Sequence, residues 1–348
     1  MTAPSDRVIL QIKDQLYEGW KSVRVTAGIE RAARDFDIDI TLRWPGQSGP
    51  DLPCVPGDAC ALRLGDDLVV TGYVDAVPVR YDAHALTVAV NGRSRTADLV
   101  DCSAHDAPGQ WLGQKVETIA AALAKPYGIA VRTEVDTGRP IADHQVQQGE
   151  TVFESLDRLL RQRQLLATDD AAGALVITKP GLLRATTALE LGGNILTGEI
   201  SRDWRDRFSE YQAKGQGSGT DSLFGVGASE CLGSATDKAI RRHRLLVVTQ
   251  SGQADTPSCG NRAEYERDLR AAKSEAVTYT VQGWRQADGA LWKPNMMVHV
   301  TDAWLGIDRD LLITEVAYTL DEGGMLTTLS LTPPEGYTVP NAGEDVDV

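Results

Sequence analysis

Hydrophobic and polar residues alternate most regularly between Pro56 and Val90. Apolar side chains recur there at every second position around a Gly-Asp-Asp turn at 65–67, which predicts a meander of antiparallel β-strands. The stretch from Pro294 to Leu331 repeats this order, with a turn led by proline, an alternating strand, a polar loop and the run LLITEV in place of LVVTGYV. Because such internal similarity indicates a duplicated unit, the sequence predicts one small β-barrel built twice.

The repeat depends on how far the two stretches can be aligned. Val74 matches Val316 after one four-residue insertion in the first hairpin turn. Any two meanders share part of such a pattern, so chance similarity is the alternative. The later match of Val90 with Leu331 favours duplication.

Further strands and helices are expected around the two meanders. Alternation predicts strands at residues 8–12, 19–25, 36–42, 129–131, 174–178, 194–201, 208–212, 245–249 and 277–281. Apolar residues at helical spacing predict a helix over 116–123. Thr151 and Glu154 have the spacing of a capping box and predict the start of a second helix. A charged surface helix is expected over 262–276, where glutamate and arginine recur at helical spacing.

These elements predict an α+β fold that is mainly β, with two similar small antiparallel β-barrels joined by an α/β insert. In the first barrel, a turn is expected at 91–94, and residues 99–102 are expected to close the barrel. The predicted parts are the first barrel (1–102), the α/β insert (103–185), the second barrel (186–335) with a glycine-rich flexible loop (214–239), and an acidic tail (336–348).

Charge and cysteine content narrow the classes of function. The formal net charge of −14 argues against a surface that binds phosphate backbones, which requires clustered Lys and Arg. The cysteines are odd in number and form no CxxC pair, so we expect buried thiols in a reducing cytoplasm. They are Cys54, Cys60, Cys102, Cys231 and Cys259. We expect no signal peptide and no membrane-spanning segment, because neither pattern occurs.

The motifs of an enzyme are missing from the sequence. Gly215, Gly217 and Gly219 do not have the GxGxxG spacing of a dinucleotide site, and Ser218 does not lie in a GxSxG elbow. The histidines lack the paired spacing of a metal site. They are His84, His105, His144, His243 and His299. We therefore expect no catalytic, cofactor-binding or metal-binding residues.

Two charged clusters have simpler explanations than catalysis. Glu150, Glu154 and Asp157 lie near a predicted helix start, where negative charge is favourable without acid–base chemistry. The basic cluster Arg241-Arg242-His243-Arg244 allows nucleic-acid contact, but on an acidic protein it favours a protein-interaction patch.

The stretch from Gln148 to Leu156 has the Gly-Glu-Thr-hydrophobic rhythm that begins a LysM-like helix–strand unit, a peptidoglycan-binding module. LysM modules usually carry a second helix and an asparagine-rich turn, which the sequence after Leu160 does not supply. The α/β insert is therefore expected to contain a LysM-like fragment whose sugar binding is open.

An ordered series of motifs between about residues 50 and 333 resembles the baseplate hub proteins of Mu-like contractile phage tails, the tail protein gpP family. The series includes GYVDAVPVRYDAHALTVAV, QQGETVFESLDRLLRQRQLLATDD, CGNRAEYERDLRAA and VQGWRQADGALWKPNMMVHVTD. The hub portion of the spike proteins of type VI secretion (VgrG) is similar in architecture.

The resemblance implies a structural protein without enzymatic activity. It implies a homotrimeric ring that joins a three-fold tail spike to a six-fold tail tube, with baseplate wedge proteins as further partners. DNA would pass through a central channel without specific binding. The protein would be assembled in the bacterial cytoplasm and would function in the virion tail baseplate.

Two other functions remain as alternatives. A cell-wall-directed tail protein would bind peptidoglycan through residues 146–180 or degrade it. A DNA-binding tail component is disfavoured by the acidic charge.

Overall fold

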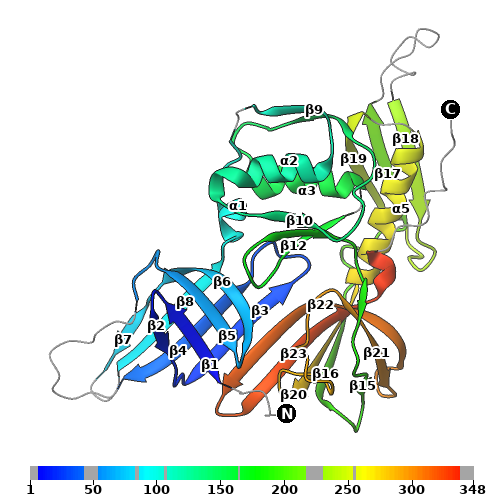
Figure 1. Ribbon diagram of the computed structural model, residues 1–348. Coiled ribbons are helices and arrows are strands. Elements are labelled where there is room, and N and C mark those ends of the chain that lie inside the picture. Colours follow the sequence, from blue (N-terminus) through cyan, green and yellow to red (C-terminus); the bar gives the residue numbers. More distant parts are fainter. Residues whose placement is uncertain are drawn as a thin grey trace. The chain divides into compact units, whose positions relative to one another are not determined.

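The computed structural model describes residues 7–42, 54–82, 86–105, 108–163, 165–216, 230–253 and 256–337 (Figure 1). The chain divides into two compact units. Unit 1 comprises residues 1–198, 279–308 and 313–330, and unit 2 comprises residues 199–278, 309–312 and 331–348.

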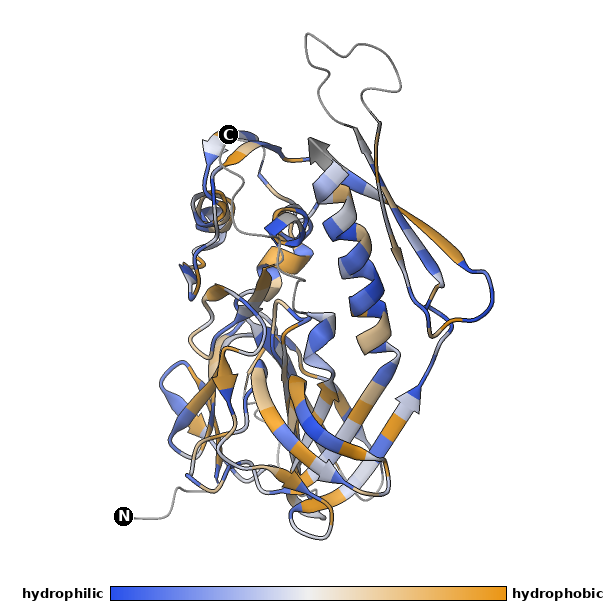
Figure 2. Ribbon diagram, turned by 90° about the vertical axis from the view of Figure 1, so that its right-hand side faces the viewer, coloured by the Kyte–Doolittle hydropathy of each residue, from blue (hydrophilic) through white to orange (hydrophobic). Residues whose placement is uncertain are grey.

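The N-terminal β region of unit 1 contains the first predicted meander. Its strands are β1 (Val8–Ile12), β2 (Gln15–Tyr17), β3 (Ser22–Gly28), β4 (Asp35–Leu42), β5 (Ala59–Leu64), β6 (Asp67–Ala76), β7 (Val79–Tyr81) and β8 (Leu86–Ser94). They pair antiparallel in the order β2-β1-β5-β6-β8-β4-β3, with β7 beside β8. Buried and half-buried residues alternate without a break along β8, as the sequence predicts, and Figure 2 shows the same alternation of hydropathy on many strands.

Two predictions for the end of this region are wrong. The predicted turn at 91–94 is part of β8, and residues 99–102, expected to close the barrel, lie mostly in helix α1 (Ala97–Asp101). The sequence predicts a turn at Gly92, but this residue lies inside the sheet, where β8 pairs with β4 on one side and with β6 on the other. A Cβ there would collide with the carbonyl oxygen of Tyr73 and the ring of Phe36. The glycine therefore permits close packing inside the sheet.

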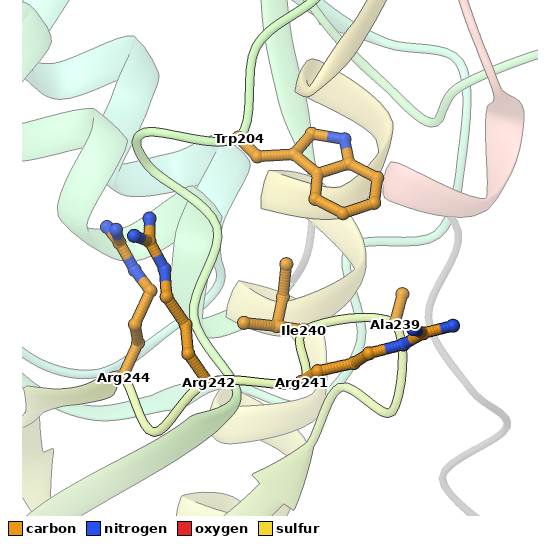
Figure 3. A pocket seen from close by; sticks show the side chains of 6 residues that line it. All are labelled: Trp204, Ala239, Ile240, Arg241, Arg242 and Arg244. Atoms are coloured by element: carbon orange, nitrogen blue, oxygen red, sulfur yellow. The ribbon is translucent and has the colours of Figure 1, made fainter.

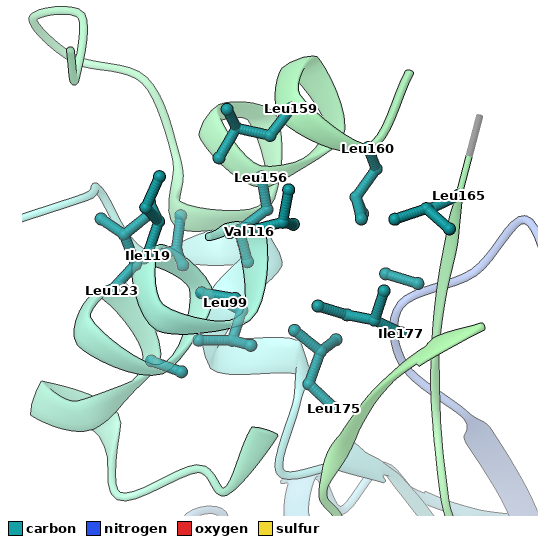
Figure 4. Close-up of a cluster of buried hydrophobic side chains, with 14 of the residues drawn as sticks. Leu99, Val116, Ile119, Leu123, Leu156, Leu159, Leu160, Leu165, Leu175 and Ile177 are labelled. Atoms are coloured by element: carbon teal, nitrogen blue, oxygen red, sulfur yellow. The ribbon is translucent and has the colours of Figure 1, made fainter. Parts of the chain in front are cut away.

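The α/β insert of unit 1 has two helices and two small sheets. Its elements are β9 (Gln110–Gln114), α2 (Val116–Ala124), η1 (Lys125–Tyr127), β10 (Val131–Thr133), β11 (Ile141–Gln145), α3 (Val152–Arg163), β12 (Leu166–Asp169) and β13 (Leu175–Thr178). β13 lies between β10, which is parallel to it, and β12, which is antiparallel. Leucine, isoleucine and valine side chains from α1, α2, α3 and this sheet form one buried core (Figure 4).

The predicted capping box at the start of α3 is confirmed. The backbone N–H of Glu154 donates to Thr151 Oγ1 at 3.2 Å, and the N–H of Thr151 donates to Glu154 Oε2 at 2.8 Å. These two bonds satisfy donors that the first helical turn leaves without intrahelical partners. The helix begins where the sequence predicts for that reason.

A buried ion pair connects the N-terminal β region to the insert. Arg34, in the turn before β4, donates from Nε to Asp169 Oδ1 at 3.0 Å and from Nη2 to the Asp169 carbonyl at 2.9 Å. Its Nη1 donates to the carbonyl oxygen of Val69 at 3.0 Å. The Asp169 side chain is almost fully buried. Loss of either partner would leave a buried charge unpaired.

The C-terminal β region contains the second predicted meander. Its strands are β14 (Leu183–Arg184), β15 (Leu189–Glu190), β16 (Ile195–Arg202), β20 (Glu275–Gln282), β21 (Met296–Asp302), β22 (Ile307–Asp321) and β23 (Gly324–Thr332). They follow the order β16-β20-β23-β22-β21, and β14 and β15 pair with β21 in parallel. The end of β22 also pairs with β3, so both β regions belong to one continuous sheet.

The mainly β class is confirmed, and two closed barrels remain a prediction. The pairings recorded among the described strands form an open path from β16 to β2. Within that path the order β3-β4-β8-β6-β5 of the first region matches β16-β20-β23-β22-β21 of the second, strand for strand along the chain.

Unit 2 is built on a three-stranded sheet covered by one helix. Its elements include β17 (Glu210–Gln216), β18 (Glu230–Thr236), β19 (Leu245–Gln253), α5 (Thr256–Lys273) and η2 (Pro334–Gly336). The strand order is β18-β17-β19, with β17 and β19 parallel. Small residues under α5 make the packing close, and Tyr211 is the largest side chain of this core.

Two predictions for unit 2 need correction. The expected flexible loop at 214–239 contains the end of β17 and all of β18, while residues 217–229 lie outside the described part. Gly233 lies against the α5 backbone at Cys259 and Gly260, where a Cβ would collide. The expected tail 336–348 begins within η2, and Tyr337 is buried. The rest of that tail lies outside the described residues.

Candidate interaction surface

The histidines do not gather into a site. His144 is buried, and its Nε2 lies 2.9 Å from Ser155 Oγ, inside the insert. His299 Nε2 lies 3.3 Å from Asp308, and His84 is outside the described residues. Within the described ranges, no group of three or more His, Cys, Asp or Glu side chains is arranged to hold a metal ion.

The three carboxylates near the start of α3 each have a local partner. Glu150 accepts two hydrogen bonds from Arg158 Nη2, at 2.8 and 3.0 Å. Asp157 forms an ion pair of 2.6 Å with Arg161, one helical turn away. Glu154 belongs to the capping box described above. These contacts agree with the structural explanation given for the cluster.

The thiols and glycines singled out in the sequence are similarly dispersed. All five cysteines are free thiols. Burial raises the pKa of Cys54 to about 11 and that of Cys60 to about 12, so neither is a reactive thiolate at neutral pH. Gly215 lies within β17, whereas Gly217, Ser218 and Gly219 lie outside the described residues.

The basic cluster, by contrast, lines a cavity of about 520 Å³ in unit 2. The cavity lies between the loop that leads into β17 and the loop that joins β18 to β19 (Figure 3). Its lining residues are Trp204, Ala239, Ile240, Arg241, Arg242 and Arg244. We call it the Trp–Arg pocket. Figure 3 shows the Trp204 ring over Ile240, with Arg242 and Arg244 side by side at one end.

The aromatic wall of the Trp–Arg pocket is fixed by a neighbouring arginine. The guanidinium of Arg207 lies 5.1 Å from the centre of the Trp204 ring. Arg207 is held in turn by Asp237, with 2.6 Å between Nε and Oδ2. The side chain of Trp204 nevertheless remains 46% exposed. An exposed tryptophan held in place is a typical anchor for a partner.

The three arginines of the pocket differ in what holds them. Arg244 donates to the carbonyl oxygen of Arg205, and its guanidinium lies 4.9 Å from the Phe208 ring. Arg241 and Arg242 are exposed, and neither has a recorded carboxylate partner among the described residues. The pocket therefore combines an apolar floor with two uncompensated positive charges, which suits an acidic ligand.

Two further surfaces expose apolar side chains. The face of the β18-β17-β19 sheet that α5 leaves open carries Leu232, Leu245 and Val247, each about half exposed. The turn before β22 carries Trp304, which is 87% exposed. Its turn is fixed by Asp302, whose Oδ1 accepts the N–H of Trp304 at 2.9 Å and whose Oδ2 accepts the hydroxyl of Tyr279 at 2.9 Å.

The sequence predicts a protein-interaction patch at the basic cluster, which stays a prediction, and it did not point to Trp204 in the cavity wall. The signal was present in the run Arg-Asp-Trp-Arg-Asp-Arg-Phe at 202–208, where a tryptophan stands among charged residues. The Trp304 turn was also missed, although an Asp two positions before an isolated Trp is typical of an exposed Asx turn.

Comparison with known proteins gives matches along most of the chain. Residues 7–94 match the family "Mu phage baseplate assembly protein GpP-like, N-terminal", residues 96–179 match "Baseplate hub protein gp44-like, second domain", and residues 255–340 match "Mu phage baseplate assembly protein GpP, fourth domain". Baseplate hub protein gp44 of Escherichia phage Mu is 35% identical over 346 residues, which cover 97% of this chain and 90% of gp44.

Solved structures agree with these matches. The 43 kDa tail protein of prophage MuSo2 from Shewanella oneidensis is 33% identical, with a TM-score of 0.86 over 96% of this chain and all of that one. The E. coli c3393 protein, a component of the type VI secretion system, shares the fold at 13% identity, with a TM-score of 0.56 over 93% of this chain and 76% of that one.

The fold and these relatives define a structural protein of a phage tail. The chain belongs to the Mu family of baseplate hub proteins that includes gp44, so it is a component of the virion tail. Within the described residues, no helix is long and apolar enough to cross a membrane.

Proposed function

We propose that this chain forms a trimeric ring that adapts the three-fold tail spike to the six-fold tail tube of a contractile tail. The observation that carries the proposal is the repeated strand order of the two β regions. Three subunits with two similar modules each present six related modules around one axis. Such a ring matches a six-fold tube on one face, while the α/β inserts keep three-fold symmetry for the spike.

The parts predicted from the sequence take separate roles in this ring. Residues 1–102 and 186–335 supply the two barrel modules, and residues 103–185 supply the insert. Closure of each barrel is part of the proposal, because open sheet edges are liabilities unless they are paired or covered. Strand β16 ends the sheet path, and Leu196 on it is 53% exposed. We infer that a neighbouring subunit covers this edge.

The partners follow from the adaptor role. The spike, the tube and the baseplate wedge proteins bind the ring, and the subunits assemble in the host cytoplasm before they enter the virion. The ring encloses a channel through which DNA passes without specific binding. The net charge of −14 supports this, because acidic walls repel the phosphate backbone. The chain acts through its interfaces and catalyses no reaction.

Light scattering of the purified chain tests the assembly. A trimer gives about three times the subunit mass of 37.6 kDa. Replacing Leu196 with Lys places a charge on the β16 edge and should shift the protein toward monomer. Leu182→Lys is the matched control, because Leu182 is 51% exposed and lies outside every strand.

A monomer at all micromolar concentrations, also in the presence of the spike protein, would contradict the trimeric ring. Pull-down on purified peptidoglycan and a turbidity assay address the cell-wall alternative. Retention on peptidoglycan or clearing of it would overturn the adaptor role in favour of a cell-wall-directed protein.

A further inference from the structure

The Trp–Arg pocket is unusual within unit 2 because its two exposed arginines, Arg241 and Arg242, have no acidic partner among the residues that the structure describes. Most other arginines of the unit lie within 4 Å of a carboxylate oxygen. The recorded pairs are Arg202–Glu275, Arg205–Asp203, Arg207–Asp237, Arg262–Glu266, Arg267–Asp268, Arg270–Glu266 and Arg309–Glu275. In a chain with 49 acidic and 35 basic residues, two exposed arginines that are consecutive in sequence and have no carboxylate partner in the described part of unit 2 indicate a site for an acidic ligand.

The floor of the pocket adds a requirement for apolar groups. Ile240 is 8% exposed and lies under the Trp204 ring (Figure 3). A ligand that fits must therefore carry carboxylates next to a small apolar side chain. A nucleic-acid phosphate backbone supplies negative charge but no apolar side chain. An acidic peptide that contains valine supplies both.

Residues near the end of the described chain share one neighbour, Arg207, with the Trp–Arg pocket. Pro333 and Glu335 line a second cavity together with Arg207, the residue whose guanidinium stacks on Trp204. Gly336 lies directly against α5 at Ala272, and Tyr337 is buried. One arginine thus separates the last described residues from the aromatic wall of the Trp–Arg pocket.

The sequence that follows Tyr337 has the required chemistry. Residues 344–347 read Glu-Asp-Val-Asp, three carboxylates around one valine. Six intervening residues, such as 338–343, span up to roughly 20 Å when a chain is extended. Covalent attachment raises the local concentration of such a segment to the order of millimolar.

We propose that the acidic segment 344–347 binds in the Trp–Arg pocket of its own chain. Its carboxylates pair with Arg241 and Arg242, and Val346 packs on Trp204 and Ile240. The bound segment shields these basic groups from competing acidic ligands, including partner proteins, until one of them displaces it. The inference concerns unit 2 alone and does not depend on trimerisation or on the adaptor role.

The test uses a fluorescein-labelled peptide of residues 340–348 and the full chain with the substitutions Glu344→Gln, Asp345→Asn and Asp347→Asn. This tail-neutral variant leaves the pocket free for the added peptide. Fluorescence anisotropy should show that the peptide binds the tail-neutral variant at least about tenfold more tightly than the native chain, in which the tethered segment competes. Binding should weaken with added salt.

Substitutions in the pocket identify the site of binding. Arg241→Gln with Arg242→Gln in the tail-neutral variant should weaken peptide binding by about tenfold or more. Arg80→Gln is the matched control, because Arg80 is an exposed arginine of β7 in unit 1, and it should leave binding unchanged. Far-UV circular dichroism checks that each variant is folded.

Three outcomes would overturn the proposal. The first is equal affinity of the peptide for the native and tail-neutral chains. The second is binding that survives the Arg241→Gln and Arg242→Gln substitutions. The third is a tail-neutral variant that binds a labelled DNA oligonucleotide but not the peptide, which would assign the pocket to phosphate.

Discussion

The two β regions have the same strand order but differ in what is inserted between their first two strands. In the first region, β3 and β4 are joined by the short segment 29–34. In the second, residues 203–274 separate β16 from β20 and form most of unit 2, including the Trp–Arg pocket. A surface hairpin tolerates insertions because its ends stay close together. The first region therefore has only a short connection at this point, and the second carries most of unit 2 with the candidate interaction surface.

The regions also differ in the length of one pair of corresponding strands, β6 and β22. β6 has 10 residues and β22 has 15. Residues 315–320 of β22 pair with β3 and join the second region to the first. The longer strand β22 therefore has two sets of partners. It pairs with β21 and β23 in its own region, and it pairs with β3 of the first region.

Interior positions that align between the copies hold different side chains. Gly72 of β6 aligns with Thr314 of β22, and Leu64 of β5 aligns with Asp302 of β21. Leu64 is fully buried in an apolar core, whereas Asp302 is a buried polar anchor for the Trp304 turn. At this aligned position the first region buries an apolar side chain, and the second buries a carboxylate that holds the turn of the exposed Trp304.

The largest loss of stability is expected where β6 and β8 lie closest together in the first region, at Gly72. A Cβ on Gly72 would collide with the Arg93 carbonyl of β8, so Gly72→Val must force the strands apart. We expect a loss of about 4 kcal/mol in the free energy of unfolding, measured by chemical denaturation. The aligned change, Thr314→Val, removes one hydrogen bond of 3.1 Å to the Ser330 carbonyl and should cost about 1 kcal/mol. Equal losses for Gly72→Val and Thr314→Val would show that the two aligned positions are packed alike.

The next effect concerns the arginines that tie the first region to other parts of unit 1. Asp169→Ala leaves the partly buried Arg34 without its carboxylate and should cost about 3 kcal/mol. Arg285 of the second region reaches Asp67 at 2.6 Å, but Asp67 is half exposed. Asp67→Ala should therefore cost less than about 1 kcal/mol. Chemical denaturation of both variants measures the difference, and a larger cost at Asp67 would contradict it.

Part of the acid sensitivity between pH 6.5 and 4 should arise in the insert, at the buried His144. Burial, with a smaller contribution from Arg158, lowers the pKa of His144 to about 4. The unfolded imidazole titrates near 6.5, so the unfolded state binds the proton first as the pH falls. Stability is complete above about pH 6.5 and falls by up to about 3 kcal/mol as the pH drops toward 4.

The pH dependence of unfolding in native protein and in His144→Gln measures this contribution. The variant should have a flatter profile between pH 6.5 and 4, since it lacks the titrating ring. A native profile that His144→Gln leaves unchanged would exclude this histidine as the cause.

A smaller effect than those of Gly72→Val, Asp169→Ala and His144 protonation is expected at the polar anchor of the second region. Asp302→Ala removes acceptors for the hydroxyl of Tyr279 and for two backbone N–H groups of the Trp304 turn. We expect a loss of about 2 kcal/mol and faster hydrogen exchange in residues 303–306. Asp308→Ala removes an exposed carboxylate of β22 and should leave the exchange rates unchanged. Unchanged hydrogen exchange in Asp302→Ala would contradict the inference that Asp302 holds the Trp304 turn in place.

Local patterns predicted the elements but not the contacts that close-packed glycines make. Alternation identified β4, β5 and β8, and the Thr151–Glu154 spacing located the start of α3, because both signals act within a few residues. The same local rules misread Gly92 as a turn and Gly233 as part of a flexible loop. Each of these glycines is packed against a segment that is distant in the sequence and leaves no space for a Cβ. A pattern of neighbouring residues cannot show such a contact.

The candidate site was only half predictable for the same reason. Three arginines within the four residues 241–244 were visible in the sequence. Trp204 is more than thirty positions away, and only the folding of unit 2 brings it to the arginines. The parallel pairing of β17 with β19 creates that proximity, and a parallel pair separated by a whole strand leaves no short-range signal.

The central claim is that the two β regions are copies of one module arranged around a common axis. A structure of the assembled protein by electron cryo-microscopy tests it most directly. The strands β3, β4, β5, β6 and β8 should superpose on β16, β20, β21, β22 and β23, with a rotation of roughly 60° about a three-fold axis. Regions at clearly different distances from the axis, or related by an unrelated rotation, would contradict the account.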